Sequence, residues 1–335
     1  MSDRDARGLG RAELHGLYRA LAMARAADER LAALHRDGSL EGPVPFRPGR
    51  SEGAAAAAFA LRRADDATGD LLVLSGSSAG AVVLFDAQLV DFFRQHLGRA
   101  TSPTGGRDTG PCWQDFTRGL IGPLASHGTM IEVMAGVTLA LRLRGEDRVG
   151  VVFYEADASA AGAWHEGLNF AAAQGCPLVL VVENDEWGAD DGRPRSSRLT
   201  TFQAKGPGYG IGSESADGTD ALAVFDAIRR AAGLARAGDG TRLVEVRYPS
   251  ASSPAEPTAV LRARMLENEW ADARELDTIE AEVAEACAVA AVQALTEPLP
   301  EGEDAVRDVY TDVTMPLPWT RAADHAGTVL AEGAA

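Results

Sequence analysis

Cysteine is scarce in this 335-residue chain, and its few cysteines are far apart. Cys112, Cys176 and Cys287 form no CxxC pair, so nothing in them indicates a disulfide framework or a zinc site. Apolar runs are short as well, because no window reaches the roughly 18 apolar residues of a membrane-spanning helix. Met1–Arg11 is polar and lacks the apolar core of a signal peptide. We therefore expect a cytoplasmic chain without a membrane segment.

Positive charge is also in short supply. The chain has 32 Lys and Arg residues against 49 Asp and Glu, which gives a net charge of −17, and Lys205 is its single lysine. A field of this sign repels nucleic acid and anionic lipid, so the composition argues against both as partners. An anionic ligand would have to be held by cations placed close to it.

What is present is a pattern typical of an α/β protein. Hydrophobic residues make up 46% of the chain, enough for one large domain or two ordinary ones. The apolar runs 149–154 and 178–182 predict buried strands, and residues 164–173 between them predict a helix. Apolar strands that alternate with helices indicate a parallel sheet covered on both faces. Further helices are predicted at 12–36, 136–143, 221–237 and 279–294, shorter strands at 71–74 and 243–246, and a long loop at 101–128.

A set of short stretches then occurs in a recognisable order. They are LYRALAMARAADERL (17–31), GRD (106–108) followed by Trp113, GAWHEGLNFAAAQGCPLVLVVEND (162–185), YGI (209–211), DGTD (217–220) and DVY (308–310). With them the chain resembles the alpha subunit of the decarboxylating component of 2-oxo acid dehydrogenase complexes, of the pyruvate, branched-chain and acetoin types. The likeness covers most of the chain, from about Glu13 to Val313.

That resemblance implies a fold, a cofactor and partners. The fold is the thiamine-diphosphate-binding fold, a central parallel sheet flanked by helices, with N-terminal helices and a C-terminal helical extension. It divides the chain into an N-terminal helical arm (1–41), an α/β domain (42–260) and a C-terminal helical extension and tail (261–335). Thiamine diphosphate, held through Mg²⁺, lies across an interface with a beta-type subunit, so a heterodimer or heterotetramer is implied. A lipoyl-bearing acyltransferase is implied as a further partner.

The metal-binding pattern of that family is altered in this chain. The family has a Gly-Asp-Gly run at a strand end and an Asn-Asn pair further along. The aspartate, the second asparagine and a nearby backbone carbonyl bind Mg²⁺, which requires oxygen ligands. The corresponding positions here are Glu155, Ala156, Asp157, Asn184, Asp185 and Trp187. The ligand aspartate is thus an alanine, and the second asparagine is a carboxylate.

Charge at these positions opposes a diphosphate. Glu155, Asp157 and Asp185 are expected to converge at the strand ends, and one like-charge pair at roughly 4 Å costs on the order of 4 kcal/mol at an effective dielectric constant of about 20. After the first strand the family has a Tyr-Arg pair, whereas residues 75–80 read SGSSAG without a cation.

Two histidines of the family are also missing, since Cys112 replaces one and YPSASSPA (248–255) contains none.

Candidates for remaining chemistry can be named. Asp157 and Asp185 are a candidate metal pair, and the alternative is that both are solvated carboxylates at strand ends. His127 and His165 are candidate catalysts without a visible partner, and His165 equally suits a structural or interface position. Cys112 is a candidate thiol nucleophile, although no His/Asp pair can be assigned to it from the sequence.

Two main hypotheses follow. In the first, the chain is an alpha-type subunit that pairs with a beta-type chain while its own cofactor site is degenerate, and it acts as a scaffold or a regulatory partner. In the second, it is an active thiamine-diphosphate-dependent 2-oxo acid decarboxylase or acyloin- or acyl-transferring enzyme, with the metal site rebuilt around Asp185 and Asp157. A third hypothesis is a different enzyme on the same fold that uses Cys112 or His165.

Overall fold

The computed structural model describes residues 8–42, 47, 49–85, 88–110, 112–122, 128–184, 199, 201–248 and 256–307. Residues Met1–Leu299 form one compact unit and Pro300–Ala335 a second. The described part of the second unit holds a short 3₁₀ helix, η6 (Gly302–Val306). All other described elements belong to the first unit. The domain boundaries expected at 41/42 and 260/261 remain predictions.

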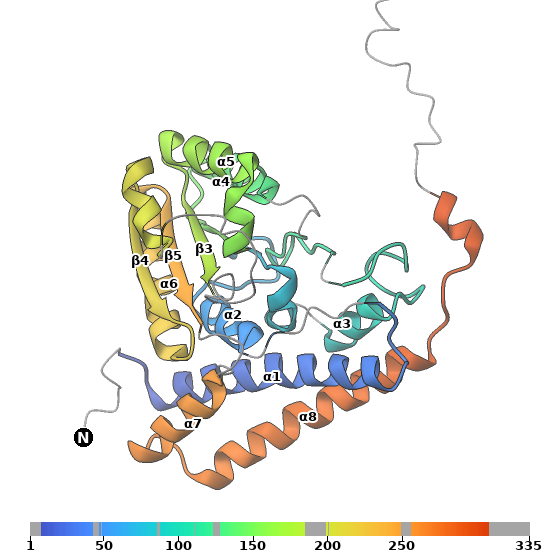
Figure 1. Cartoon of the computed structure of the whole chain (residues 1–335). Helices are drawn as coiled ribbons and strands as arrows, with labels where there is room; N and C mark the ends of the chain where they lie inside the picture. The colour runs from blue at the N-terminus through green and yellow to red at the C-terminus, as the bar shows by residue number, and fades with distance from the viewer. Residues whose placement is uncertain are drawn as a thin grey trace, which may run out of the picture. The chain divides into compact units, whose positions relative to one another are not determined.

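Five parallel strands form the sheet of the first unit, in the order β1-β2-β3-β5-β4 (Figure 1). They are β1 (Leu71–Val73), β2 (Gly150–Glu155), β3 (Leu178–Asn184), β4 (Gly212–Asp217) and β5 (Arg242–Arg247). The strands predicted at 149–154 and 178–182 are β2 and β3, which pair from Gly150 opposite Leu178 onwards. β4 was not predicted, because its sequence GSESAD is polar and lies at the edge of the sheet.

Side chains of β2 alternate between two hydrophobic cores, one on each face of the sheet. Val151 and Phe153 belong to one core, and Val152 and Tyr154 belong to the other. Helices α1 (Arg11–Arg36), α2 (Arg50–Phe59) and α6 (Ala221–Leu234) contribute to the first core, and α4 (Thr129–Leu143) and α5 (Gly162–Gln174) to the second. The predicted parallel sheet with helices on both faces is confirmed.

The long helices α1 and α8 (Ala273–Thr296) run side by side (Figure 1). α8 begins at a capping box, in which Asp272 and Glu275 each accept a hydrogen bond of 2.8 Å from the other's backbone N–H. Its buried residues recur at helical spacing, as predicted for 279–294: Leu276, Ile279, Val283, Cys287, Ala290, Ala291 and Ala294. α3 (Leu89–His96) packs against α8, and α7 (Pro257–Glu267) packs against α1. Among the described helices, none is long and apolar enough to cross a membrane.

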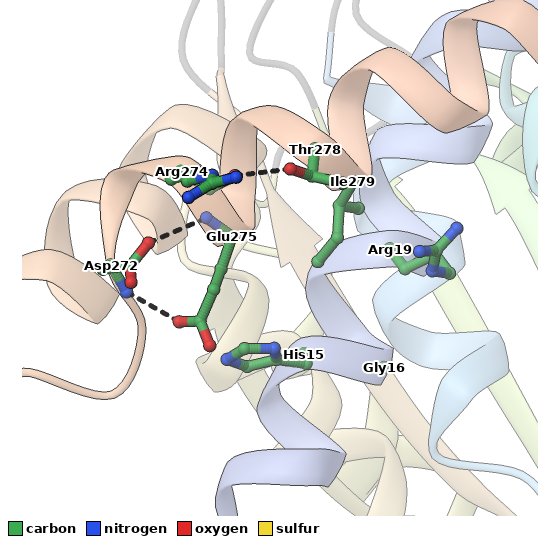
Figure 2. Close-up of a pocket in the computed structure, with 8 residues that line it drawn as sticks. All are labelled: His15, Gly16, Arg19, Asp272, Arg274, Glu275, Thr278 and Ile279. Atoms are coloured by element: carbon green, nitrogen blue, oxygen red, sulfur yellow. Dashed lines mark hydrogen bonds between the residues drawn. The ribbon is translucent and has the colours of Figure 1, made fainter.

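A surface pocket of about 570 Å³ opens between α1 and the first turns of α8 (Figure 2). Its lining consists of His15, Gly16, Arg19, Asp272, Arg274, Glu275, Thr278 and Ile279. The two acidic residues are engaged in the capping box, and His15 Nε2 lies 3.2 Å from the carbonyl oxygen of Trp270. Much of the polar lining therefore stabilises the helix junction.

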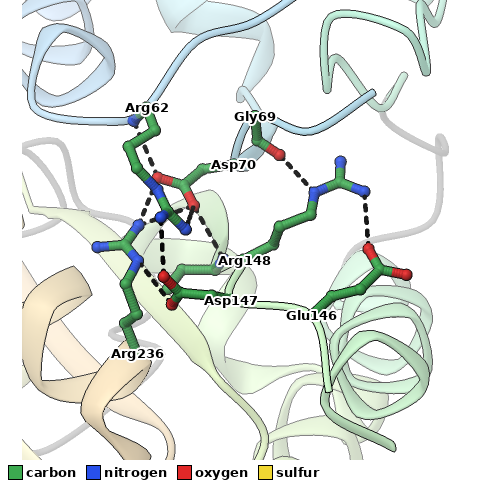
Figure 3. Close-up of polar contacts among 8 residues, drawn as sticks. Arg62, Gly69, Asp70, Glu146, Asp147, Arg148 and Arg236 are labelled. Carbon is green, nitrogen blue, oxygen red and sulfur yellow. Dashed lines mark hydrogen bonds and ion pairs between the residues drawn. The ribbon is translucent and has the colours of Figure 1, made fainter. Parts of the chain in front are cut away.

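Asp70 lies directly before β1, at the amino edge of the sheet (Figure 3). Its carboxylate accepts two hydrogen bonds from Arg236 Nη2, at 2.6 and 2.8 Å, and one each from the backbone N–H groups of Arg62 (2.9 Å) and Val149 (3.0 Å). Both arginines also pair with Asp147. The side chain of Asp70 is 0% exposed, whereas that of Asp147 is 63% exposed. Asp70 therefore ties the starts of β1 and β2 to η5 (Ala235–Asp239), the turn that follows α6.

We predict that Asp70→Ala lowers the free energy of unfolding by about 3–5 kcal/mol, because it removes the buried acceptor of Arg236 and of the N–H groups of Arg62 and Val149. The matched control is Asp147→Ala, which removes an exposed partner of the same arginines and should cost about 1 kcal/mol or less. Urea denaturation of both variants measures the difference. Equal losses would contradict the role given to Asp70.

Candidate functional site

The positions singled out in the sequence lie at the carboxyl edge of the sheet, where parallel strands bring their ends together. Glu155 ends β2 and pairs opposite Glu183 of β3. The next residue, Asn184, ends β3 and pairs opposite Arg247 at the end of β5. Glu155 and Asn184 therefore end neighbouring strands at the same edge of the sheet, and the convergence expected for Glu155, Asp157 and Asp185 stays a prediction. Three of the predicted positions, Asp185, Trp187 and His127, lie outside the described residues.

Residues 155–157 offer little to a metal ion. Glu155 is partly exposed, and its carboxylate lies 3.8 Å from Arg47 Nη2. Ala156 and Asp157 begin η2 (Ala156–Ala160), the short turn after β2. Asp157 is exposed there and has no hydrogen-bond or ion-pair partner within the described ranges. Position 156, where the resemblance implies the ligand aspartate, is an alanine and presents only a methyl group.

Asn184 is engaged within the sheet. Its side-chain Nδ2 donates a hydrogen bond of 2.8 Å to Glu245 Oε1, and its backbone carbonyl accepts one of 2.7 Å from Tyr248 N–H. The other oxygen of Glu245 accepts a bond of 3.0 Å from Gln203 N–H. The amide of Asn184 therefore helps to join β3, β5 and η4 (Gln203–Tyr209).

Glu183 is a fully buried acidic residue at this edge. Hydrogen bonds reach it from Ser75 Oγ (2.5 Å) and Ser78 Oγ (2.7 Å), in the segment after β1. Arg50 Nη1 lies 3.4 Å from its Oε1, and the guanidinium of Arg50 stacks on the ring of Tyr248 at 4.4 Å. Burial raises the pKa of Glu183, while Arg50 and the two serines favour its ionised form.

Sequence reasoning missed this cluster, although it noted that residues 75–80 contain no cation. The structure brings Arg50 to that segment from the start of α2, and Arg50 is committed to Glu183. The sequence did contain a signal for it. Glu183 directly follows the apolar run 178–182, and a glutamate at the end of a buried strand needs hydrogen-bond donors or a positive side chain beside it.

Comparison with known proteins identifies the family to which this fold belongs. The family model of the dehydrogenase E1 component matches residues 22–249, more than half of the chain. The chain belongs to this family. The match spans α2, the sheet and its covering helices, so the resemblance to E1 alpha subunits and the predicted fold class are both confirmed.

Relatives of the E1 family support the same assignment. The chain is 27% identical over 314 residues to the alpha subunit of acetoin:2,6-dichlorophenolindophenol oxidoreductase of Cupriavidus necator, which covers 88% of this chain and 93% of that protein. It is 27% identical over 239 residues to the alpha subunit of 2-oxoisovalerate dehydrogenase of Bacillus subtilis, 71% of each chain. It is also 30% identical over 217 residues to the pyruvate dehydrogenase E1 alpha subunit of Rhizobium meliloti, 59% of this chain and 60% of that protein.

His165, one of the candidate catalysts, lies on the exposed side of α5 in this E1 chain. Its Nδ1 is hydrogen-bonded to the hydroxyl of Tyr209, and the two rings are stacked. Beneath them Trp164 is buried, and Lys205 Nζ lies 4.7 Å from its ring centroid and 3.1 Å from Ser159 Oγ. These contacts join α5, η2 and η4, which agrees with the structural alternative named for His165.

Cys112 does not have the surroundings of a reactive thiol. Burial, and secondarily the charge of Asp108, raise the pKa of Cys112, which favours the thiol over the nucleophilic thiolate. No histidine is hydrogen-bonded to it in the part of the chain that the structure describes. The described ranges also contain no group of three or more His, Cys, Asp or Glu residues placed to hold a metal ion.

We predict that Arg50→Leu lowers the free energy of unfolding by about 3–5 kcal/mol, because it removes the buried positive charge beside the fully buried Glu183. Adding Glu183→Leu to that variant should recover much of the loss, since no buried charge then remains unpaired. The matched control is Arg19→Leu on α1, which breaks an exposed pair with Glu282 and should cost about 1 kcal/mol or less. Chemical denaturation measures all three, and no recovery in the double variant would count against the pairing.

Proposed function

We propose that this chain is a divergent alpha-type subunit of a 2-oxo acid dehydrogenase-like complex that pairs with a beta-type chain and whose own magnesium–thiamine diphosphate site is degraded. The observation that carries the proposal is Ala156 at the end of β2, where the family pattern has the metal-binding aspartate. Pairing is supported by the relatives, which are named as alpha subunits. A lipoyl-bearing acyltransferase is the further partner that such a complex would have, and a cytoplasmic location stays a prediction.

The donor set at the site supports loss of the metal. Mg²⁺ requires several oxygen ligands in near-octahedral geometry. Of the described residues at the former ligand positions, Ala156 supplies none, Asp157 is turned to solvent in η2, and Glu155 is paired with Arg47. These residues do not fit a bound magnesium–diphosphate group.

The positive side chains at the carboxyl edge of the sheet also support loss of the diphosphate site. A diphosphate needs positive charge close by, because the chain as a whole is strongly acidic. Arg47 and Arg50 lie at this edge, each beside a carboxylate, Glu155 and Glu183 respectively. The hydroxyls of Ser75 and Ser78 are likewise bonded to Glu183. An incoming anion would have to displace these internal pairs.

The chain retains what a non-catalytic subunit needs. Most residues of its sheet and of both hydrophobic cores, and the contacts of Asp70 at the opposite edge, lie away from positions 155–157. Fold and cofactor chemistry are separable in this way because ligand residues stand at strand ends while packing residues fill the strands. Such a subunit can act as a scaffold or regulatory partner for a beta-type chain.

Calorimetric titration tests the proposal. The chain, purified together with its beta-type partner, is titrated with thiamine diphosphate in the presence of Mg²⁺, and we expect flat heats up to millimolar cofactor. A variant that restores the family pattern, carrying Glu155→Gly, Ala156→Asp, Asp157→Gly and Asp185→Asn, should gain measurable binding. The beta-type partner should co-purify with both forms.

Tight cofactor binding by the unaltered chain would overturn the proposal. It would favour the alternative, an active thiamine-diphosphate enzyme with its metal site rebuilt around Asp185 and Asp157. In that case Asp157→Ala and Asp185→Ala should each abolish the binding. Failure of the beta-type chain to co-purify would overturn the pairing separately.

A further inference from the structure

Three carboxylates are buried around the first turn of α2. We call Asp28 of α1, Glu52 of α2 and Glu183 of β3 the buried acid cluster, since each is less than a tenth exposed. Asp28 and Glu52 repel one another, and the buried ring of Tyr248 is close enough to feel the charges of both Glu52 and Glu183. The cluster therefore extends from α1 to the carboxyl edge of the sheet.

Asp28 links three elements. Ser51 of α2 and the backbone N–H of Gly80 in η1 (Gly76–Leu84) lie close to its carboxyl group and favour its ionised form. The Ser51 hydroxyl in turn accepts a hydrogen bond of 2.9 Å from Gly80 N–H. A Cβ atom at Gly80 would lie 2.5 Å from Asp28 Oδ1 and 2.6 Å from the carbonyl oxygen of Ala24. The backbone of η1 thus packs directly against α1 beside the buried Asp28.

Glu52 makes a similar link on the other side of α2. Its Oε1 accepts hydrogen bonds from Thr258 N–H (3.1 Å) and Thr258 Oγ1 (2.5 Å), in the first turn of α7. Glu256, the N-cap residue of α7, makes no side-chain capping bond of its own. The two acids together hold the start of α2 against α1, η1 and α7.

The buried acid cluster contains too few positive side chains to neutralise its three carboxylates. Arg50 is the buried arginine beside it, and it lies against Glu183. From α1, Arg25 and Glu29 face the cluster, but they pair with one another, and Arg25 also pairs with Glu280 of α8. η1 carries no charged side chain, and Arg262 of α7 is directed to Tyr18, Asp277 and Glu280.

Three buried carboxylates against one buried arginine favour retention of a proton in the cluster. Burial is the largest cause that raises the pKa of each acid, and it raises the pKa of Asp28 to about 7. Glu52 and Glu183 each have compensating hydrogen bonds or a nearby arginine that favour ionisation. Asp28 lacks an arginine partner of this kind within the described ranges and is the group that holds the proton most readily.

We propose that Asp28 is the proton-binding side chain of a pH-sensitive switch, which holds α1, α2 and η1 together while Asp28 is protonated and loosens their junction when it ionises. The switch acts on the candidate site, because α2 carries Arg50 and η1 carries Ser78, both of which compensate Glu183. It does not require a bound cofactor and is independent of the proposed function.

The sign of the effect follows from linkage. An acid whose pKa is higher in the closed junction than in the opened one stabilises the closed form at low pH. That contribution is complete below the ordinary pKa of an aspartate and is lost as pH rises through about 7, the value in the closed form. Ionised Asp28 remains buried and destabilises the junction above that pH.

Hydrogen exchange of the full-length chain, corrected for the intrinsic pH dependence of exchange, tests the switch. Protection of amides around Asp28 in α1 and around Gly80 in η1 should fall about tenfold per pH unit from about pH 5 and level off near pH 7. Asp28→Asn, which mimics the protonated acid, should remove this dependence and keep the protection high. The matched control is Glu285→Gln on α8, which changes an exposed carboxylate outside the cluster and should behave as the unaltered chain does.

A pH dependence that persists in Asp28→Asn would overturn the proposal, as would its absence in the unaltered chain. Infrared spectra of the unaltered chain provide a test that needs no variant. They should show a protonated carboxyl band near pH 6 that is lost as pH rises above about 8. If no such band is lost, the switch is excluded even where Asp28→Asn fails to fold.

Discussion

A carboxylate buried at the end of a central strand needs hydrogen-bond donors or positive charge from other parts of the chain. At the carboxyl edge of this sheet that carboxylate is Glu183. Arg50 from α2 and the hydroxyls of Ser75 and Ser78 after β1 meet this need. Because these groups come from separate segments, the position of α2 and of η1 against the sheet is tied to one acid. Tyr248, at the end of β5, completes the arrangement by stacking on Arg50.

The elements that sequence reasoning located are those whose signal is local. β2 and β3 are continuous apolar runs, and α8 repeats its apolar residues at helical spacing, so both types are visible without knowledge of the neighbours. β4 was missed because a polar edge strand has no such signal. The likeness to E1 alpha subunits then supplied the fold class and the positions at which the altered metal residues are expected.

The cluster around Glu183 could not be predicted in the same way. Ser75 and Glu183 are 108 residues apart, and Arg50 reaches them from before β1. Only the folded sheet brings the three together. Asp70 is a similar case at the opposite edge, because its partner Arg236 is 166 residues away. Long-range pairing of buried charges depends on tertiary packing and leaves no periodic trace in the sequence.

Lys205 has a consequence for how the molecule can be handled chemically. It is the single lysine of 335 residues, and its ammonium group lies over the rings of Trp164 and Phe202 with Ser159 as its hydrogen-bond partner. Burial also lowers the pKa of Lys205. Amine-directed reagents therefore have one side chain to find in this chain, and a label there reports on the contact between α5 and η4. Apart from an α-amino terminus, no other amine is present in the 335 residues to react with such reagents.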